Sequence, residues 1–347
     1  MNPRSSTGIR DSLLWSIFWA PESPVVKVAQ KFGITRQAVQ LHLRQLAREG
    51  KVTAEGKARW RRYRLRPLSV DEEAWAIGSG FTEDKVWESF VRPRIENLDE
   101  HANEIAHYGV TEMVNNVIDH ARATRVKVTM ERSAIARTFT VSDNGVGMFQ
   151  KISSALKLAD PREALLDLSK GKFTTDPKRH TGEGIFFTSR SFDRFSIQSL
   201  GLVFTRSVLI DDWVVTEEKR KQAGTKITMS LLLPPQRKLL DVFTKFSSGP
   251  EDYRFAKTRV PLKLATLGDE SLVSRSSAKR VLARIETFDE VLMDFAGIKS
   301  IGQAFADEVF RVFSLAHPAV QLIPVNANEQ VTSMIRRAQT AAKESER

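Results

Sequence analysis

The sequence predicts an α+β protein with three folded domains along one chain. A helical segment followed by a basic hairpin occupies residues 8–68, and a long helix precedes strands and glycine-containing turns at residues 95–235. A strand–helix–strand pattern then fills residues 253–340. With 347 residues, 41% of them hydrophobic, the chain is long enough for each domain to bury its own core.

The composition excludes several classes of protein. No apolar run approaches the roughly 18–20 residues that cross a bilayer, and the first residues lack the pattern of a signal peptide. We therefore expect a cytoplasmic protein with no membrane partner. The chain has no Cys, which excludes disulfides and thiol chemistry, and its six His are scattered, so we expect no structural metal site.

The positive charge is concentrated near the N-terminus. The formal net charge is +11, and residues 1–70 hold 14 Lys and Arg against four Asp and Glu. The remainder of the chain is therefore close to neutral. A basic surface confined to one segment indicates a polyanionic partner for that segment.

The first domain opens with an apolar helix and continues as a helix-turn-helix. Gly33 is placed to end the short second helix, and Thr35 to cap the third, which is predicted over residues 36–49. The helical spacing assigns the buried face of this third helix to Val39, Leu43 and Leu46. Its outward positions, which we expect to contact DNA, are Arg36, Gln37, Gln40 and Arg44.

A hairpin with a basic second strand follows this helix. Glu55 and Gly56 form the predicted turn, and the second strand is predicted over residues 59–65. Residues 57–66 hold six Lys and Arg and no acid. The predicted phosphate contacts are Arg59, Arg61 and Arg62. A solvated charged strand, or a surface for protein contacts, is the alternative.

The segment 8–68 as a whole resembles the winged helix-turn-helix domains of bacterial transcription regulators. This resemblance implies double-stranded DNA as a partner but does not identify a target sequence. A more acidic stretch, residues 69–94, is predicted to link this domain to the next.

The second domain contains a helix with an acid and an amide on one face. Glu112 and Asn116 are four residues apart, so their side chains project from the same side of the helix. A carboxylate there can act as a general base, and an amide oxygen one turn later can ligate Mg²⁺. Taken alone, the pair also fits an exposed polar helix surface.

A glycine-flanked aspartate follows two predicted strands, residues 125–130 and 138–142. Asp143 ends the second strand, where its carboxylate can accept a hydrogen bond from the amino group of adenine. Gly145 and Gly147 allow the backbone to approach the base. A tight turn between strands is the alternative for this hexapeptide.

A second pair of glycines, Gly182 and Gly184, lies at the start of a later helix. Backbone N–H groups at such a junction can bind phosphates, although an ordinary helix start has the same pattern. Lys178 and Arg179 precede this loop and are predicted to contact the terminal phosphates. A late strand over residues 224–229 carries Thr225, which is placed to support Asp143.

These four motifs, in this order, resemble the GHKL superfamily of ATP-binding domains, which have the Bergerat α/β sandwich fold. The resemblance implies ATP and Mg²⁺ as cofactors, Glu112 as general base, Asn116 as magnesium ligand, Asp143 as the adenine-binding residue and residues 171–184 as a lid. The chain has no P-loop motif. It departs from the family at Glu183, where an apolar residue is more usual and where a carboxylate pointing toward the phosphates would weaken binding.

The C-terminal segment resembles STAS domains, and more closely the uncharacterised STAS-like family fused to such ATPases. Residues 294–304 carry the resemblance, between predicted strands at 291–295 and 320–325. It implies a small α/β domain with a protein partner. In the anti-sigma factor antagonists a phosphorylatable serine opens the helix, and here the matching positions are Gln303 and Ala304.

Three functions fit these domains. The first is a regulator in which Mg-ATP occupancy changes binding of DNA or a partner. The second is a serine/threonine protein kinase of the anti-sigma type, and the third is a slow ATPase. A histidine kinase is disfavoured, because neither His101 nor His107 lies in a phosphoacceptor motif. The sequence leaves the oligomeric state open, including a homodimer.

Overall fold

The computed structural model describes residues 6–56, 61–95, 97–158, 160–173, 182–209, 212–218, 222–249, 252, 254–266 and 271–345. The chain forms two compact units. The first contains residues 1–74, 127–140 and 230–236, and the second contains residues 75–126, 141–229 and 237–347. None of the helices in the described part of the chain combines the length and the apolar character needed to cross a membrane.

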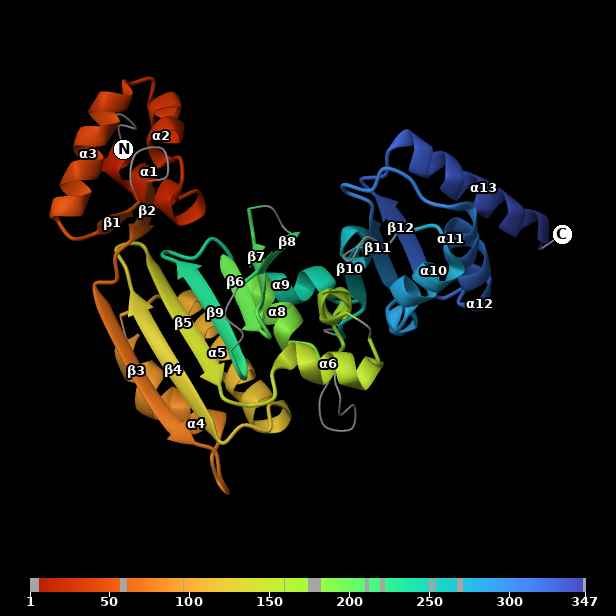
Figure 1. The fold of residues 1–347 in the computed structure, drawn as a ribbon, viewed down its shortest axis with the longest axis horizontal. Helices are drawn as coiled ribbons and strands as arrows, with labels where there is room; N and C mark the ends of the chain where they lie inside the picture. Colours follow the sequence, from red (N-terminus) through yellow and green to blue (C-terminus); the bar gives the residue numbers. More distant parts are fainter. Residues whose placement is uncertain are drawn as a thin grey trace. The chain divides into compact units, whose positions relative to one another are not determined.

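The first unit begins with the three predicted helices, α1 (Ser6–Trp19), α2 (Pro24–Phe32) and α3 (Arg36–Arg48) (Figure 1). Gly33 ends α2 in the left-handed conformation with φ 62°, and the Thr35 hydroxyl accepts a hydrogen bond from the Ala38 amide at 3.2 Å. The predicted caps are therefore confirmed. The core of this bundle contains Leu13, Val39, Leu43 and Leu46.

The predicted hairpin is also present in the first unit. β1 (Val52–Glu55) pairs antiparallel with β2 (Arg62–Leu65), with Val52 opposite Leu65. Three helices followed by this hairpin make a winged helix-turn-helix, as the sequence predicted.

The winged helix packs on a hairpin turn from the middle of the chain. Phe18 of α1 lies in one apolar cluster with Ala136 and Leu232. The Leu68 amide donates to the carbonyl of Arg132 at 2.6 Å, and the Leu233 amide donates to the carbonyl of Ile135 at 2.9 Å. The core of the N-terminal domain therefore continues into the sheet of the following domain.

That sheet has seven strands in the order β3-β4-β5-β9-β6-β7-β8. Their bounds are β3 (Ser69–Ala76), β4 (Arg125–Arg132), β5 (Ala136–Asp143), β6 (Arg194–Ser199), β7 (Leu202–Ser207), β8 (Asp212–Glu217) and β9 (Thr225–Leu232). The three strands predicted between residues 125 and 229 correspond to β4, β5 and β9. β6, β7 and β8 form an antiparallel meander, with Arg194 opposite Ser207 and Leu202 opposite Glu217.

The stretch 69–94, expected to be a linker, is instead folded. It forms β3 at one edge of the sheet, then α4 (Glu83–Val86) and a π-helical turn (Trp87–Val91). The Trp75 ring packs edge-on against Phe90, with ring centroids 5.7 Å apart. Acidic side chains are compatible with an edge strand because one side of it faces solvent, and Glu72 there pairs with Lys127 of β4 at 3.3 Å.

Besides α4, the second unit has five α-helices before the C-terminal domain in its described residues: α5 (Glu100–His120), α6 (Met148–Leu156), α7 (Ala164–Lys170), α8 (Gly184–Ser191) and α9 (Leu239–Phe246). Asp99 caps α5 by accepting a hydrogen bond from the Ala102 amide at 3.0 Å. α5 packs against α8, and α9 contacts both helices (Figure 1). This arrangement places Glu112 and Asn116 of α5 near the start of α8.

The C-terminal domain has a three-stranded parallel sheet in the order β10-β11-β12, as expected for strands joined by helices (Figure 1). Its elements are β10 (Lys257–Pro261), α10 (Arg275–Leu282), β11 (Glu290–Asp294), α11 (Gln303–Asp307), α12 (Ser314–Ala316), β12 (Gln321–Val325) and α13 (Glu329–Ser345). The predicted strands at 291–295 and 320–325 are β11 and β12. α11 begins at Gln303, so the position matching the serine of the antagonists is a glutamine.

Candidate functional site

The aspartate at the end of β5 is held by two backbone donors. Its Oδ1 accepts a hydrogen bond from the Gly145 amide at 2.7 Å, and its Oδ2 accepts one from the Thr225 amide at 3.2 Å. Burial raises the pKa of Asp143, and these two hydrogen bonds oppose that increase. The carboxylate is therefore fixed in orientation and partly shielded from water.

The loop after Asp143 requires glycine at specific points. A Cβ on Gly145 would lie 2.1 Å from the carbonyl oxygen of Ala121, at the end of α5. Gly147 has φ 85°, and a Cβ there would lie 2.7 Å from Ser199 Oγ. The neighbouring Asn144 anchors the same loop, because its Oδ1 accepts hydrogen bonds from the amides of Thr124 at 3.1 Å and Arg125 at 3.0 Å. These contacts bring the loop close to α5 and the start of β4.

Thr225 contacts this loop through two groups. Besides the amide bond to Asp143, its hydroxyl accepts a hydrogen bond from the Met148 amide at 2.8 Å. Gly224, just before it, has φ 78°, and a Cβ there would lie 2.0 Å from the carbonyl oxygen of Asp143. The start of β9 therefore fixes both the aspartate and the first residue of α6.

A pocket opens beside Asp143, with about 650 Å³ of space between protein atoms including its mouth. Its polar and charged lining consists of Asn116, His120, Asp143, Lys151 and Thr225. Its apolar lining includes Met113, Val117, Val141, Met148, Ile152, Leu168, Phe173, Ile185 and Ile227. A mostly apolar pocket with a few convergent polar groups is typical of a site for a small organic ligand.

Of the predicted site residues, four line this pocket: Asn116, Asp143, Gly147 and Thr225. Glu112 does not line it but lies against the start of α8, where a Cβ on Gly184 would be 2.1 Å from Glu112 Oε2. Gly182 has φ 72° and packs on the backbone of Phe173. Lys178 and Arg179 lie outside the described residues.

Glu183, the unusual acid between these glycines, lies near α5. Burial raises the pKa of Tyr108, and the charges of Glu112 and Glu183 raise it further. Tyr108 therefore stays protonated between two carboxylates. Glu183 itself does not line the pocket.

Lys151 and Phe173 are pocket residues that the sequence motifs did not predict. Lys151 lies one turn into α6, and its ammonium donates to the carbonyl of His120 at 2.8 Å. The available signal was a basic residue four positions after Gly147, on the helix that follows the glycine-flanked aspartate. This contact places a positive charge at the pocket, next to the C-terminus of α5.

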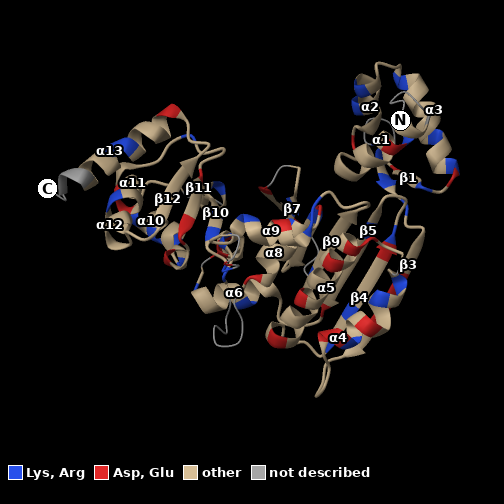
Figure 2. Ribbon diagram, turned by 180° about the vertical axis from the view of Figure 1, so that it is seen from behind, with Lys and Arg blue, Asp and Glu red and all other residues tan. Residues whose placement is uncertain are grey.

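The predicted DNA contacts lie on the exposed side of α3 and on the hairpin. Arg36, Gln37 and Arg44 are exposed, and Gln40 is half-buried, with its amide 3.5 Å from the Tyr63 hydroxyl. Arg61 and Arg62 are exposed, whereas Arg59 lies outside the described residues. Figure 2 shows Lys and Arg recurring along α2, α3 and the start of the hairpin.

Comparison with known families agrees with these observations. Residues 103–237 match the family described as histidine kinase-, DNA gyrase B- and HSP90-like ATPase, and residues 277–332 match the family described as a STAS-like domain of unknown function. Residues 103–237 therefore contain a domain of the GHKL class. More particularly, the chain joins a GHKL ATPase domain to a STAS-like domain, as its motifs predicted.

The other two comparisons add little. No curated protein matches the chain. Among solved structures, an IcIR transcriptional regulator from Alicyclobacillus acidocaldarius matches with 11% identity over 69% of this chain and 94% of that chain. Its TM-score is 0.20, which is too low to indicate a shared fold.

Proposed function

We propose that this protein is an ATP-binding and DNA-binding regulator, in which Mg-ATP occupancy of the GHKL pocket changes the binding of DNA or of a protein partner. The observation that carries the proposal is Asp143, a half-buried carboxylate fixed by two backbone N–H groups at an apolar pocket. A fixed acceptor of this kind suits the amino group of adenine, and the apolar lining suits the purine ring.

The residues around the pocket fit the rest of the nucleotide. The Asn116 amide oxygen would hold Mg²⁺, which prefers a few oxygen ligands from protein together with phosphates and water. Backbone N–H groups of the loop with Gly182 and Gly184, at the start of α8, would bind the phosphates, and Lys178 and Arg179 would contact the terminal phosphates. Bound magnesium supplies neutralisation of phosphate charge.

DNA binding is supported by the charge and shape of the N-terminal domain. Its third helix presents Arg36, Gln37 and Arg44 to solvent, and its hairpin presents Arg61 and Arg62. The cluster of Phe18, Ala136 and Leu232 joins this domain to the hairpin turn at the start of β5, the strand that ends at Asp143. We propose that this continuous strand transmits nucleotide occupancy to the DNA-binding domain.

A protein kinase is the second candidate, and a specific observation favours testing it. Glu112 lies against Gly184 at the start of α8, which is where a general base beside the phosphates is needed. His107 lies in no phosphoacceptor motif, and its ring packs on Trp87 with centroids 4.4 Å apart.

The Glu112→Ala variant distinguishes a regulator that needs no ATP turnover from a protein kinase or an ATPase. For a regulator that does not need turnover, the variant should bind ATP and shift DNA affinity as the wild type does. We expect wild type and variant to release or transfer phosphate equally slowly, as measured with γ-³²P-ATP. A loss of phosphate transfer or release of more than about tenfold in the variant would instead assign the protein to the enzymes.

Replacing Arg59, Arg61 and Arg62 by Gln should reduce the salt dependence of DNA binding. Each phosphate contact contributes about 0.9 to the slope of log affinity against log salt, so the slope should fall by about 2 to 3. Fluorescence anisotropy with a random duplex of about 30 base pairs, across a salt series, measures it.

The control for this charge change is Arg336→Gln with Arg337→Gln on α13, which removes two positive charges where the hairpin variant removes three. This variant removes positive charge from the other end of the chain and should leave the slope unchanged. An unaltered slope in the hairpin variant would exclude the hairpin from phosphate contact.

A further inference from the structure

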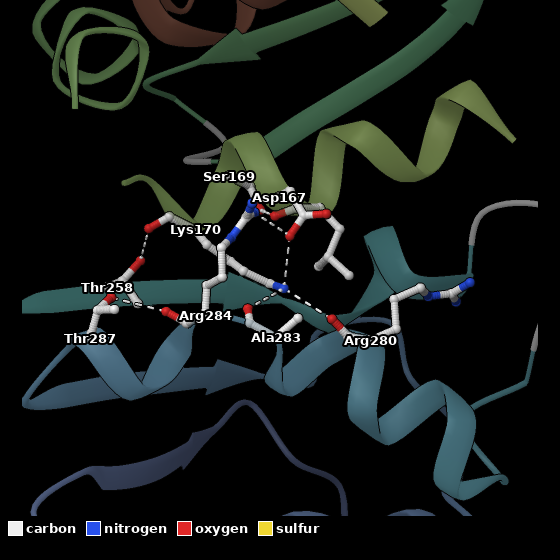
Figure 3. Close-up of polar contacts among 9 residues, drawn as sticks. Asp167, Ser169, Lys170, Thr258, Arg280, Ala283, Arg284 and Thr287 are labelled. Atoms are coloured by element: carbon white, nitrogen blue, oxygen red, sulfur yellow. Dashed lines mark hydrogen bonds and ion pairs between the residues drawn. The ribbon is translucent and has the colours of Figure 1, made fainter. Parts of the chain in front are cut away.

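α7 lies between the pocket and the C-terminal domain. All seven of its residues are buried, from Ala164 to Lys170. Leu168 lines the pocket, whereas Asp167 and Lys170 contact residues beyond 279. Figure 3 shows these polar groups meeting between α7 and the C-terminal domain. A short helix with contacts on both sides can link a ligand in the pocket to that domain.

The ammonium group of Lys170 joins α7 to the end of α10. It donates to the carbonyl oxygens of Arg280 at 3.0 Å and Ala283 at 3.1 Å, and it lies 3.2 Å from Asp167 Oδ1 (Figure 3). Carbonyl groups at the end of a helix lack partners within the helix, and a cation there also faces the negative end of the helix dipole. Lys170 therefore caps α10 from outside that helix.

The backbone at this point is bonded to the C-terminal domain as well. The hydroxyl of Thr258, in β10, donates to the carbonyl oxygen of Lys170 at 2.6 Å. Two residues later, Lys172 donates to the carbonyl of Thr287 at 2.7 Å, and its ammonium lies 4.3 Å from the Phe288 ring centroid. The chain leaving α7 is thus fixed to the C-terminal domain at two successive points.

Arg284 contacts both α7 and the pocket wall. Its guanidinium donates to Asp167 Oδ1 at 2.6 Å, and its Cζ lies 4.6 Å from the ring centroid of Phe173, which lines the pocket. The Arg284 backbone has φ 67°, a left-handed conformation uncommon for a residue with a side chain.

The charges of Asp167, Lys170 and Arg284, which form one cluster, depend on one another. Asp167 is 7% exposed at its side chain and Lys170 1% exposed, so neither ion is compensated by water. Burial lowers the pKa of Lys170 to about 8, although Asp167 and Glu286 favour its charged form. Removing Asp167 would take away the carboxylate that pairs with both Lys170 and Arg284, so the cluster is sensitive to displacement of that carboxylate.

We propose that the nucleotide pocket is coupled to the STAS-like domain by three residues, Asp167, Lys170 and Arg284, here called the α7 clamp. Within the clamp, Arg284 is a positioning residue for the pocket wall. This inference rests on the proposed ATP site. Nucleotide in the pocket contacts Leu168 and Phe173, and the clamp transmits their displacement to α10. Because coupling between binding sites is reciprocal, a partner that binds the STAS-like domain and shifts α10 changes ATP affinity by the same factor.

Amide hydrogen exchange on the full chain, with and without ATP and Mg²⁺, tests the proposal. Two regions are compared: the pocket segments at residues 112–121 and 141–152, and α10 at residues 275–282. In the wild type, nucleotide should slow exchange in both regions. In Arg284→Ala, the pocket should still respond, α10 should not, and the dissociation constant for ATP should rise about tenfold.

Arg311→Ala is the matched control. Arg311 is an arginine of the same domain, its side chain is 29% exposed against 30% for Arg284, and it pairs with Asp307 as Arg284 pairs with Asp167. It should behave as the wild type. Arg284→Gln is measured in parallel. It keeps a polar side chain, so it provides a second test if the alanine variant does not fold. Arg284→Lys, which restores the charge, should recover part of the α10 response.

The outcomes distinguish a failure of the clamp from a failure of the ATP site. A wild-type pocket that responds to ATP while α10 does not would overturn the clamp and leave the ATP site standing. An equal response of α10 in wild type, Arg284→Ala and Arg284→Gln would also overturn the clamp and leave the ATP site standing. A pocket that does not respond in the wild type would refute the ATP site, and the clamp proposal with it.

Discussion

Asp143→Asn is expected to weaken ATP binding by about 100-fold, or roughly 2.7 kcal/mol. Both oxygens of Asp143 accept hydrogen bonds from backbone amides, of Gly145 and Thr225. An amide side chain offers one oxygen, so its NH₂ group would face one of these N–H donors, and the loop would move. The acceptor for adenine is lost at the same time. Titration calorimetry with ATP and Mg²⁺ measures the change.

Asp241→Asn is the control for this substitution, because Asp241 is exposed on α9 and does not line the pocket. The wild type should also lose affinity as the pH falls. Burial raises the pKa of Asp143 above its usual 3.8, so the carboxylate takes up a proton at a higher pH than an ordinary aspartate does. Asp143→Asn should lack this pH dependence. An affinity in the variant within threefold of the wild type would remove Asp143 from the site.

Asn116→Ala is expected to abolish the magnesium dependence of ATP binding. Asn116 lines the pocket from α5, one turn beyond Glu112, and its amide oxygen is the proposed metal ligand. In the wild type, affinity should be much higher with Mg²⁺ than with EDTA, and in the variant the ratio should fall to about one. Calorimetric titrations in the two buffers give this ratio.

Asn115→Ala is the matched control for Asn116. It removes the same side chain from the adjacent position, which does not line the pocket. Its affinity ratio should equal that of the wild type. If Asn116→Ala kept the full effect of magnesium, the metal ligand would have to be sought elsewhere in the chain.

Local signals predicted much of the fold. Gly33 and Thr35 mark helix ends through their own backbone and side-chain preferences, so the helix-turn-helix could be placed within a residue or two. The same holds for Asp143 and its glycines, because a buried strand that runs into two closely spaced glycines indicates a sharp turn with a close backbone approach. These features depend on residues close together in the sequence.

Features that depend on distant partners were not predicted. β3 was interpreted as a linker because Asp71, Glu72 and Glu73 mask the pattern of a strand, and only its position at a sheet edge makes that composition favourable. Lys170 is a comparable case. Nothing in the local sequence shows that it is buried, since its partners Arg280 and Ala283 are 110 and 113 residues away. The motifs therefore located the pocket but not the clamp beside it.

Titration calorimetry of the full chain shows whether the pocket beside Asp143 binds ATP with magnesium. We predict saturable binding of about one nucleotide per chain, an increase in the unfolding temperature with ATP, and loss of both in Asp143→Asn. A wild-type protein that gives no binding heat and no change in unfolding temperature at millimolar ATP and Mg²⁺ would contradict this account.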